Sequence, residues 1–186
     1  VGSSIDLDQF RSLPESEKKH DVVFLGRLHE LKGVFDLPEV WAQVKTARPA
    51  ATLKVIGEGP HRTAVMDRFA TRNLMDGVEF TGGIGEEDKN RLLAEARLGL
   101  SLSSEEGWGL AVNEYLASEL PVVAYDLPVF QEVFPDVLHS VSLGDKTAAS
   151  RAILELLADP AAREAMGREG RELAQRYDYR AMAREE

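Results

Sequence analysis

Two cationic side chains follow the first apolar run of the chain. Arg27 and Lys32 are five residues apart, and Gly33 comes directly after them. A guanidinium binds phosphate oxygens through two parallel hydrogen bonds, and an ammonium acts as a compact point charge. A helix that begins near Gly33 would add amide donors and the positive end of its dipole. This pattern suits a diphosphate ligand, although two solvated loop charges would have the same spacing.

The densest cluster of candidate ligand-binding residues is the segment 103–114, Ser-Ser-Glu-Glu-Gly-Trp-Gly-Leu-Ala-Val-Asn-Glu. Its carboxylates Glu106 and Glu114 are eight residues apart, and each is a two-oxygen acceptor suited to paired sugar or ribose hydroxyls. The glycines on both sides of Trp108 allow the backbone to approach a ligand closely. The helix that follows begins with unpaired amides. The carboxylate spacing alone is not specific, but the glycines between the two carboxylates make this segment a candidate site.

The same region carries only negative charge. From residue 101 to residue 140 the chain has no Lys or Arg. An anionic ligand bound there needs backbone amides or cations from elsewhere in the chain, and Arg27 and Lys32 are the candidates. The acidic residues of this stretch are Glu105, Glu106, Glu114, Glu119, Asp126, Glu132 and Asp136.

Two further patterns follow predicted strands. The segment 57–60, Gly-Glu-Gly-Pro, begins like a dinucleotide-binding fingerprint, but Arg62 stands where the third glycine would be. It therefore favours a tight turn into a helix, and NAD binding is not expected. Asp126 comes after the fifth predicted strand and is either a ligand or a helix cap.

The motifs of several other enzyme classes are missing from the sequence. No Gly-x-Ser-x-Gly elbow and no Walker phosphate loop occurs. The chain has no cysteine, which excludes disulfides, thiolate zinc sites and iron–sulfur clusters. None of the four histidines has a zinc-binding spacing. These histidines are His20, His29, His61 and His139.

The composition is typical of one soluble globular domain. The chain has 186 residues, of which 44% are hydrophobic, and a formal net charge of −10. The negative charge argues against a nucleic-acid polymer or an anionic lipid surface as partner. No apolar run approaches the roughly 18–20 residues that span a bilayer, and no basic-then-apolar leader occurs at the start. We therefore expect a cytoplasmic protein.

The elements that must position these residues alternate along the chain. Short apolar runs predict strands at 21–26, 52–57, 77–82, 98–102, 121–125 and 137–143. Helical spacing predicts helices at 34–47, 60–72, 86–96 and 111–118, and again from 146 onward with breaks near 159–160 and 177–178. This alternation predicts an α/β fold, a Rossmann-like open parallel sheet with helices on both faces. Ligands of such sheets bind outside the carboxyl ends of the strands, which here are Leu25, Ile56, Phe80, Leu102 and Tyr125.

The ordered set of strand-end motifs resembles the C-terminal, donor-binding half of a retaining family-4 (group 1) glycosyltransferase with the GT-B architecture. The resemblance covers about residues 1–186. The matching pieces are Gly26-Arg27-Leu28 with Lys32-Gly33, Gly57-x-Gly59-Pro60, Val78-x-Phe80-x-Gly82, Glu106-Gly107-x-Gly109 with Glu114, and Pro121-Val122-Val123.

The resemblance implies a nucleotide-diphosphate sugar as donor and a catalytic role for Arg27, Lys32 and Glu106. The two cations would neutralise the diphosphate leaving group as its charge develops. Glu106 would hold the transferred sugar and the distal phosphate together with the backbone amides of Gly107, Trp108, Gly109 and Leu110. Glu114 would hold the ribose hydroxyls, and the backbone around Ile84 would face the base. Family members usually need no metal, so we expect neither metal nor cofactor.

The sequence departs from the family pattern in three places and in length. Glu119 stands where the family commonly has glycine, 127–130 replaces a glycine-containing turn after Asp126, and Trp108 takes the place of a frequent Phe. Family enzymes also have an acceptor-binding N-terminal half, which residues 1–186 do not include. The chain is therefore expected to be a single donor-binding domain that transfers sugar poorly alone, with any membrane contact made through the other half.

Two alternatives to the hexosyltransferase-like function remain open. One is a different enzyme on the same architecture, a phosphorylase or an epimerase, and phosphate-dependent release of sugar 1-phosphate would indicate the former. The other is a non-catalytic interaction domain, which would bind no nucleotide sugar at all.

Overall fold

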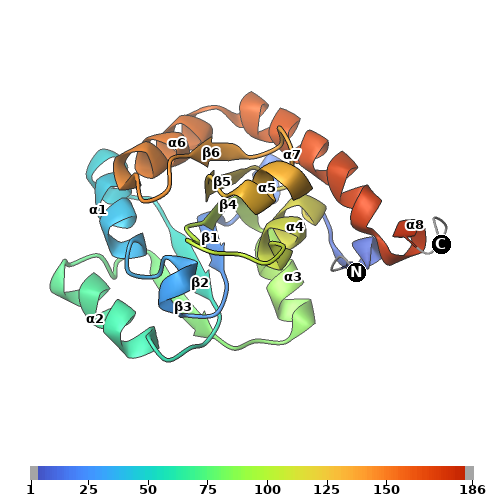
Figure 1. Ribbon diagram of the computed structural model, residues 1–186. Helices are drawn as coiled ribbons and strands as arrows, with labels where there is room; N and C mark the ends of the chain where they lie inside the picture. The colour runs from blue at the N-terminus through green and yellow to red at the C-terminus, as the bar shows by residue number, and fades with distance from the viewer. Residues whose placement is uncertain (1–3, 183–186) are drawn as a thin grey trace.

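The protein folds around a single six-stranded sheet, seen in a computed structural model that describes residues 4–182 (Figure 1). All strand pairs are parallel, and the strand order is β3-β2-β1-β4-β5-β6. The predicted Rossmann-like α/β fold is therefore confirmed. The strands are β1 (His20–Leu25), β2 (Leu53–Ile56), β3 (Val78–Gly82), β4 (Ala96–Ser101), β5 (Val122–Tyr125) and β6 (His139–Val141).

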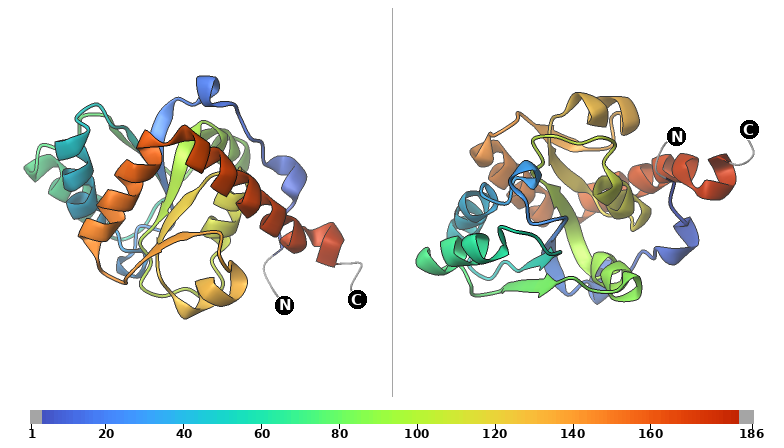
Figure 2. Two further views of the ribbon diagram at one scale, coloured as in Figure 1. Left: turned by 90° about the horizontal axis from the view of Figure 1, so that it is seen from above. Right: turned by 60° about the horizontal axis from the view of Figure 1, so that its bottom comes forward.

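Helices cover both faces of this sheet, as Figure 2 shows from two sides. One face packs against α1 (Leu37–Ala47), α2 (Arg62–Thr71) and α6 (Lys146–Ala158). The other face packs against α3 (Glu86–Ala94), α4 (Leu110–Ala117) and α5 (Pro128–Val133), with the end of α7 (Pro160–Ala174) beside them. The short helices are η1 (Leu7–Gln9), η2 (Glu15–Glu17), η3 (Glu30–Lys32), η4 (Gln175–Tyr177) and α8 (Tyr179–Met182).

Alternate residues of each central strand enter opposite cores. Val22 and Phe24 of β1 lie in the core under α1 and α6, whereas Val23 lies in the core under α4. A strand that is buried on both faces must be apolar throughout. This explains why apolar runs located the central strands, and all six predicted strands lie within two residues of their observed ends.

The helices differ from the sequence-based expectation in several places. The first helix begins at Leu37 and not near Gly33, because 33–36 form turns. Helix α3 ends at Ala94, and Ala96 already belongs to β4. The segment 128–133 forms α5 where a loop was expected.

The first and last described segments meet at one corner of the molecule. The Ile5 amide donates to the Tyr177 carbonyl (3.0 Å), and the Tyr179 amide donates to the Ile5 carbonyl (3.0 Å). The views in Figures 1 and 2 agree that the first described segment lies beside the end of α7 and α8. Residues 1–3 and 183–186 lie outside the described part.

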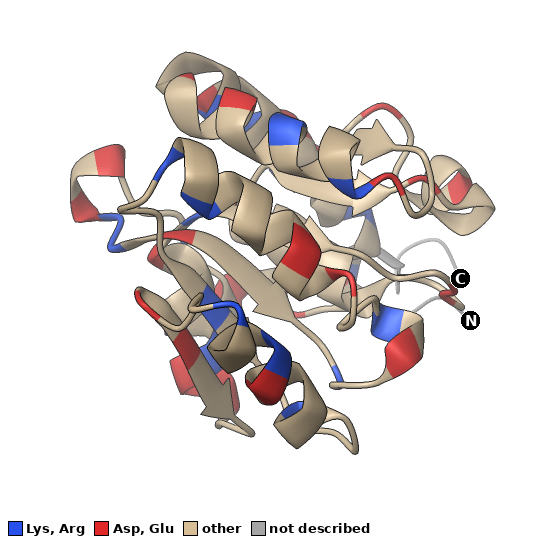
Figure 3. Ribbon diagram, turned by 90° about the vertical axis from the view of Figure 1, so that its left-hand side faces the viewer, with Lys and Arg blue, Asp and Glu red and all other residues tan. Residues whose placement is uncertain are grey.

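Acidic and basic residues are interspersed on the side of the molecule shown in Figure 3, where neither sign covers a whole helix. Within residues 4–182, no helix combines the length and the apolar character needed to cross a membrane.

Candidate functional site

The predicted catalytic residues Arg27, Lys32 and Glu106 lie where the order of the strands reverses direction. The chain proceeds outward from β1 through β2 to β3, then returns to place β4 on the other side of β1. The loops that follow β1 and β4 therefore face each other across a crevice, which is where ligands of open α/β sheets bind. The two loops are joined directly, because the Ser104 amide donates to the Leu31 carbonyl (2.9 Å).

The backbone around Arg27 is held by the turn that follows β2. The Gly26 amide donates to the Ile56 carbonyl (3.0 Å), and the Leu28 amide donates to the Glu58 carbonyl (2.9 Å). This contact requires Gly57, whose φ is +135° and whose added Cβ would lie 2.0 Å from the Gly26 carbonyl oxygen. The expected tight turn is thus confirmed.

The Arg27 side chain itself is exposed, and within residues 4–182 its guanidinium forms no hydrogen bond or ion pair. A rigid backbone therefore presents a guanidinium that is available to a ligand.

Lys32 and Glu106 form an ion pair across the crevice. The Lys32 ammonium lies 2.5 Å from Glu106 Oε1, and the two side chains are 31% and 12% exposed. The buried Ser103 hydroxyl donates to the same oxygen (2.8 Å). Both donors bind Oε1, so the other Glu106 oxygen accepts no hydrogen bond from the described residues. The cation that the acidic stretch lacks is supplied from the loop after β1, as the charge distribution predicted.

A cavity of about 290 Å³ lies between these two loops. It brings together the three predicted catalytic residues, of which Lys32 is paired with Glu106 and Arg27 has no partner among residues 4–182. His29 also lines the cavity, which the sequence did not suggest. Its ring nitrogen Nδ1 accepts a hydrogen bond from the Leu31 amide (3.3 Å). The cavity is lined by Arg27, His29, Leu31, Lys32, Glu105, Glu106 and Gly107.

Helix α4 begins beside this cavity. Its N-cap, Gly109, has a φ of +100°, and an added Cβ would lie 2.7 Å from the Phe130 ring and 2.9 Å from the Phe134 ring. Because glycine has no side chain to cap the helix, the first amides of α4 have no side-chain acceptor there. Unpaired helix amides favour an anion. Leu110, the first residue of the helix, is 48% exposed.

Trp108 turns away from the cavity. Its ring packs edge-on against Phe134 (centroids 5.4 Å apart) and against Tyr177 (5.0 Å). The Trp108 side chain therefore fixes the glycine loop to α5 and the C-terminal segment, so that of this predicted donor-binding residue only the backbone lies at the loop.

Glu114 lies in α4 and is buried, with an exposed fraction of 9%. The ammonium of Lys89 on α3 lies 2.6 Å from Glu114 Oε1. Lys89 was not predicted, because a single lysine in a polar helix gives no signal that it is buried. Burial raises the pKa of Glu114, and the hydrogen bond from Lys89 opposes that rise.

The remaining predicted positions lie farther from the cavity. Ile84 lines a separate groove of about 480 Å³ beside α3, together with Leu92 and Thr81. Asp126 is not a helix cap: α5 begins after Leu127 and has no side-chain cap. The carboxylate of Asp126 instead accepts hydrogen bonds from the Gln131 amide nitrogen (2.9 and 3.0 Å).

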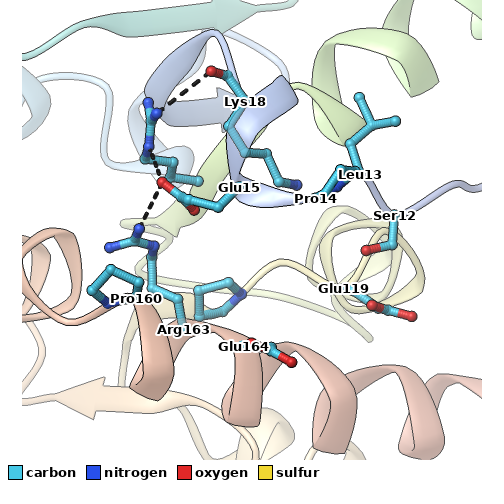
Figure 4. A pocket seen from close by; sticks show the side chains of 11 residues that line it. Ser12, Leu13, Pro14, Glu15, Lys18, Glu119, Pro160, Arg163 and Glu164 are labelled. Carbon is cyan, nitrogen blue, oxygen red and sulfur yellow. Dashed lines mark hydrogen bonds and ion pairs between the residues drawn. The ribbon is translucent and has the colours of Figure 1, made fainter.

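A second cavity, of about 360 Å³, lies at the amino edge of the sheet, among the residues drawn in Figure 4. Its cations are already paired. The Glu15 carboxylate lies 2.6 Å from Arg97 and 2.8 Å from the buried Arg163, and the Lys18 ammonium donates to the Ala94 carbonyl (2.8 Å). These contacts attach η2 to the sheet and to α7. Because its cations already have partners, this cavity is a weaker candidate for an anion site than the cavity between the loops after β1 and β4.

Two solved structures illustrate the fold that this chain shares. The Anabaena protein HepE, solved with UDP and glucose, superposes with a TM-score of 0.86 at 18% identity, over 98% of this chain and 53% of that chain. The C-terminal domain of a glycosyl transferase group 1 family protein, LpcC from Francisella tularensis, superposes with a TM-score of 0.80 at 19% identity, over 94% of this chain and 99% of that chain. At these identities the likeness shows the fold.

The sequence comparisons identify the family. A phosphatidyl-myo-inositol mannosyltransferase of Propionibacterium freudenreichii subsp. shermanii is 31% identical over 164 residues, which are 85% of this chain and 40% of that protein. The chain thus spans less than half the length of this relative. Residues 6–173 match the family described as "Glycosyl transferases group 1". The fold, the crevice between β1 and β4 and this match together show that the chain belongs to the group 1 glycosyltransferases.

Proposed function

We propose that this chain is the donor-binding domain of a retaining glycosyltransferase that moves a sugar, a hexose in the simplest case, from a nucleotide-diphosphate sugar to an acceptor. The observation that carries the proposal is the convergence of Arg27, Lys32 and Glu106 on one cavity beside the first amides of α4. Two cations and a helix N-terminus suit a diphosphate, and a carboxylate that keeps one unoccupied oxygen suits a sugar hydroxyl.

The proposed roles divide the crevice between the parts of the donor. Arg27 and Lys32 stabilise the charge that develops on the diphosphate as the sugar leaves. Glu106 and the amides of residues 107–110 hold the transferred sugar and the distal phosphate. Glu114 accepts the ribose hydroxyls, and the segment around Ile84 faces the base. Because Arg27 and Lys32 are assigned the stabilisation of the diphosphate charge, we propose that no metal or other cofactor takes part.

The acceptor is bound, in this proposal, by a separate N-terminal half of a longer protein. Two comparisons support this: the chain spans 40% of the length of the mannosyltransferase, and it matches a solved C-terminal domain over 99% of that domain. Reaction in the cleft between two halves also means that residues 1–186 alone bind donor more readily than they transfer sugar. We propose a cytoplasmic location, with membrane contact, if any, through the acceptor half.

The proposal is tested by calorimetric titration of UDP-, GDP- and ADP-sugars into the wild-type chain and into Arg27→Ala. Loss of a charged hydrogen bond costs about 1.5–3 kcal/mol, so the variant should bind the responding donor about 10- to 150-fold more weakly. Arg151→Ala is the matched control, because Arg151 is exposed on α6 and lies outside the cavity. If neither UDP-, GDP- nor ADP-sugars bind to the wild-type chain, the donor-binding function is refuted. Equal affinity in Arg27→Ala would refute only the role of Arg27.

A further inference from the structure

The lysine that contacts Glu114 is buried to an unusual degree for its type. Lys89 on α3 is 8% exposed, and its ammonium lies 2.6 Å from Glu114 Oε1 and 2.6 Å from Glu86 Oε2. Lysine is almost never fully buried unless it is paired. The two partners differ: the Glu114 side chain is 12% exposed, whereas that of Glu86 is 74% exposed. The pair with Glu114 is therefore the one that water screens least.

The contact uses only one oxygen of the carboxylate. Lys89 binds Oε1, and Oε2 of Glu114 receives no hydrogen bond from residues 4–182. Oε2 is also absent from the buried polar atoms that lack a partner, so some solvent reaches it. Glu114 thus has one oxygen held by Lys89 and one that solvent reaches in part.

We propose that Lys89 is a positioning residue of the nucleotide pocket: its ammonium keeps the buried Glu114 carboxylate charged and occupies Oε1, so that Oε2 is the acceptor presented to a ribose hydroxyl. The inference rests on the proposed function for the identity of the ligand. The contact that carries it, between Lys89 and Glu114, does not depend on any ligand.

Charge balance at Glu114 explains why such a residue is needed. Burial favours the neutral carboxylic acid and raises the pKa of Glu114, and the like charge of Glu86 adds to the rise. Lys89 is the cation that opposes both. Burial also opposes the charge of Lys89, but its hydrogen bonds to Glu114 and Glu86 leave its pKa raised. The neighbouring Tyr115 hydroxyl stays neutral, since burial raises its pKa and the carboxylates of Glu114 and Glu106 add to this.

Replacing the ammonium should therefore make nucleotide binding dependent on pH. In Lys89→Met the pKa of Glu114 rises further, and one pKa unit is a factor of about ten in the protonation equilibrium. We expect the affinity for UDP, GDP or ADP, whichever the wild type binds, to fall about tenfold or more at pH 6 and to recover toward pH 9. Lys89→Arg should restore most of the affinity at pH 6. Glu87→Gln, an exposed neighbour on the same helix, should leave it unchanged.

Two measurements keep this inference separate from the proposed function. The first is the Glu114 pKa by carboxyl NMR without ligand, which should be higher in Lys89→Met than in the wild type. The second is a cycle with Glu114→Gln, in which Lys89→Met should cause no further loss because the carboxylate is gone. The double variant removes both charges, so it also folds without an uncompensated buried ion.

The outcomes are distinct. Suppose that the wild type binds no nucleotide but that the Glu114 pKa is higher in Lys89→Met. This result would refute the donor function but not the coupling between Lys89 and Glu114. A Lys89→Met variant that binds the nucleotide as the wild type does from pH 6 to pH 9, or whose Glu114 pKa does not rise, overturns the role of Lys89.

Discussion

At the scale of single residues, the two site carboxylates are each held by a lysine from another element. Glu106 pairs with Lys32 from the loop after β1, and Glu114 pairs with Lys89 from α3. Each lysine binds one carboxylate oxygen, and the other oxygen accepts no hydrogen bond from residues 4–182. A diphosphate that attracts Lys32 would loosen its hold on Glu106, after which the Ser103 hydroxyl alone would orient that carboxylate.

Tyr115 links the two strands that define the crevice. Its buried hydroxyl accepts a hydrogen bond from the Leu25 amide (2.6 Å) and donates to the Leu100 carbonyl (3.2 Å). Tyr115→Phe leaves both backbone groups without a partner, and we expect it to lower the free energy of unfolding by about 1–3 kcal/mol. Urea unfolding measures this change, with Tyr179→Phe, at a position 46% exposed, as the control. No difference between the two variants would contradict the structural role of the hydroxyl.

At the scale of elements, the sequence predicted the positions of the strands but missed one short helix and the start of another. The central strands were found because their buried residues form apolar runs, as in Val22, Val23 and Phe24 of β1. Helix α5 was missed because it is six residues long, with only Phe130 and Val133 buried. The start of α1 was placed too early because Val34 is as buried as Leu37, so the helical spacing continues into the turns.

The residues of the candidate site were also predicted only in part. Arg27, Lys32 and Glu106 follow strand ends, and their meeting at one cavity could be expected from the parallel sheet. Ser103 and Lys89 could not be singled out, because residue type does not tell whether a polar side chain is buried. The structure also explains why the family commonly has glycine at position 119. The φ of Glu119 is +56°, in the left-handed region, where glycine is unstrained.

Gly109 should be the least replaceable glycine of the segment between Glu106 and Glu114. In Gly109→Ala the left-handed backbone costs about 1–2 kcal/mol, and the close approach to Phe130 and Phe134 adds about 1–3 kcal/mol of overpacking. We expect a clear drop in Tm and in donor affinity. Gly107→Ala is the matched control, because nothing lies within 4 Å of its added Cβ. Equal melting temperatures for the two variants would show that α4 begins differently.

At the scale of the whole molecule, a chain with a net charge of −10 holds a cation-lined crevice because of its topology. The reversal between β1 and β4 places Arg27 and Lys32 opposite a stretch of 40 residues that has no cation of its own. The amino edge holds a separate set of ion pairs around Glu15. The two edges can therefore be altered independently, since the ion pair Lys32–Glu106 at one edge and the ion pairs of Glu15 at the other share no residue.

Global stability should respond to pH through His20 at the start of β1. Its ring is 2% exposed, and its Nε2 lies 2.8 Å from the Leu92 carbonyl oxygen. Burial lowers the pKa of His20 below the ordinary value of 6.5, an effect that the hydrogen bond to Leu92 only partly opposes. The unfolded chain thus takes up the proton more readily, so the free energy of unfolding should decrease as the pH falls from about 7 through 6.5 and below.

The check is denaturant unfolding of the wild type and His20→Gln between pH 5 and pH 8. The amide of Gln keeps a donor for the Leu92 carbonyl but does not titrate. The difference in unfolding free energy between the two proteins should therefore shift in favour of His20→Gln as the pH falls. A difference that stays constant over this range would show that His20 keeps an ordinary pKa.

The position of the two tryptophans gives the molecule an internal optical reporter. Trp41 is fully buried in the core under α1 and α6, whereas Trp108 packs against the core on the other face of the sheet. Trp108 is half-buried and lies between the cavity loop and the ring of Tyr177. Its fluorescence emission is therefore sensitive to movement of residues 106–110, while Trp41 supplies a constant background. Occupancy of the crevice can be followed by emission intensity without any attached dye.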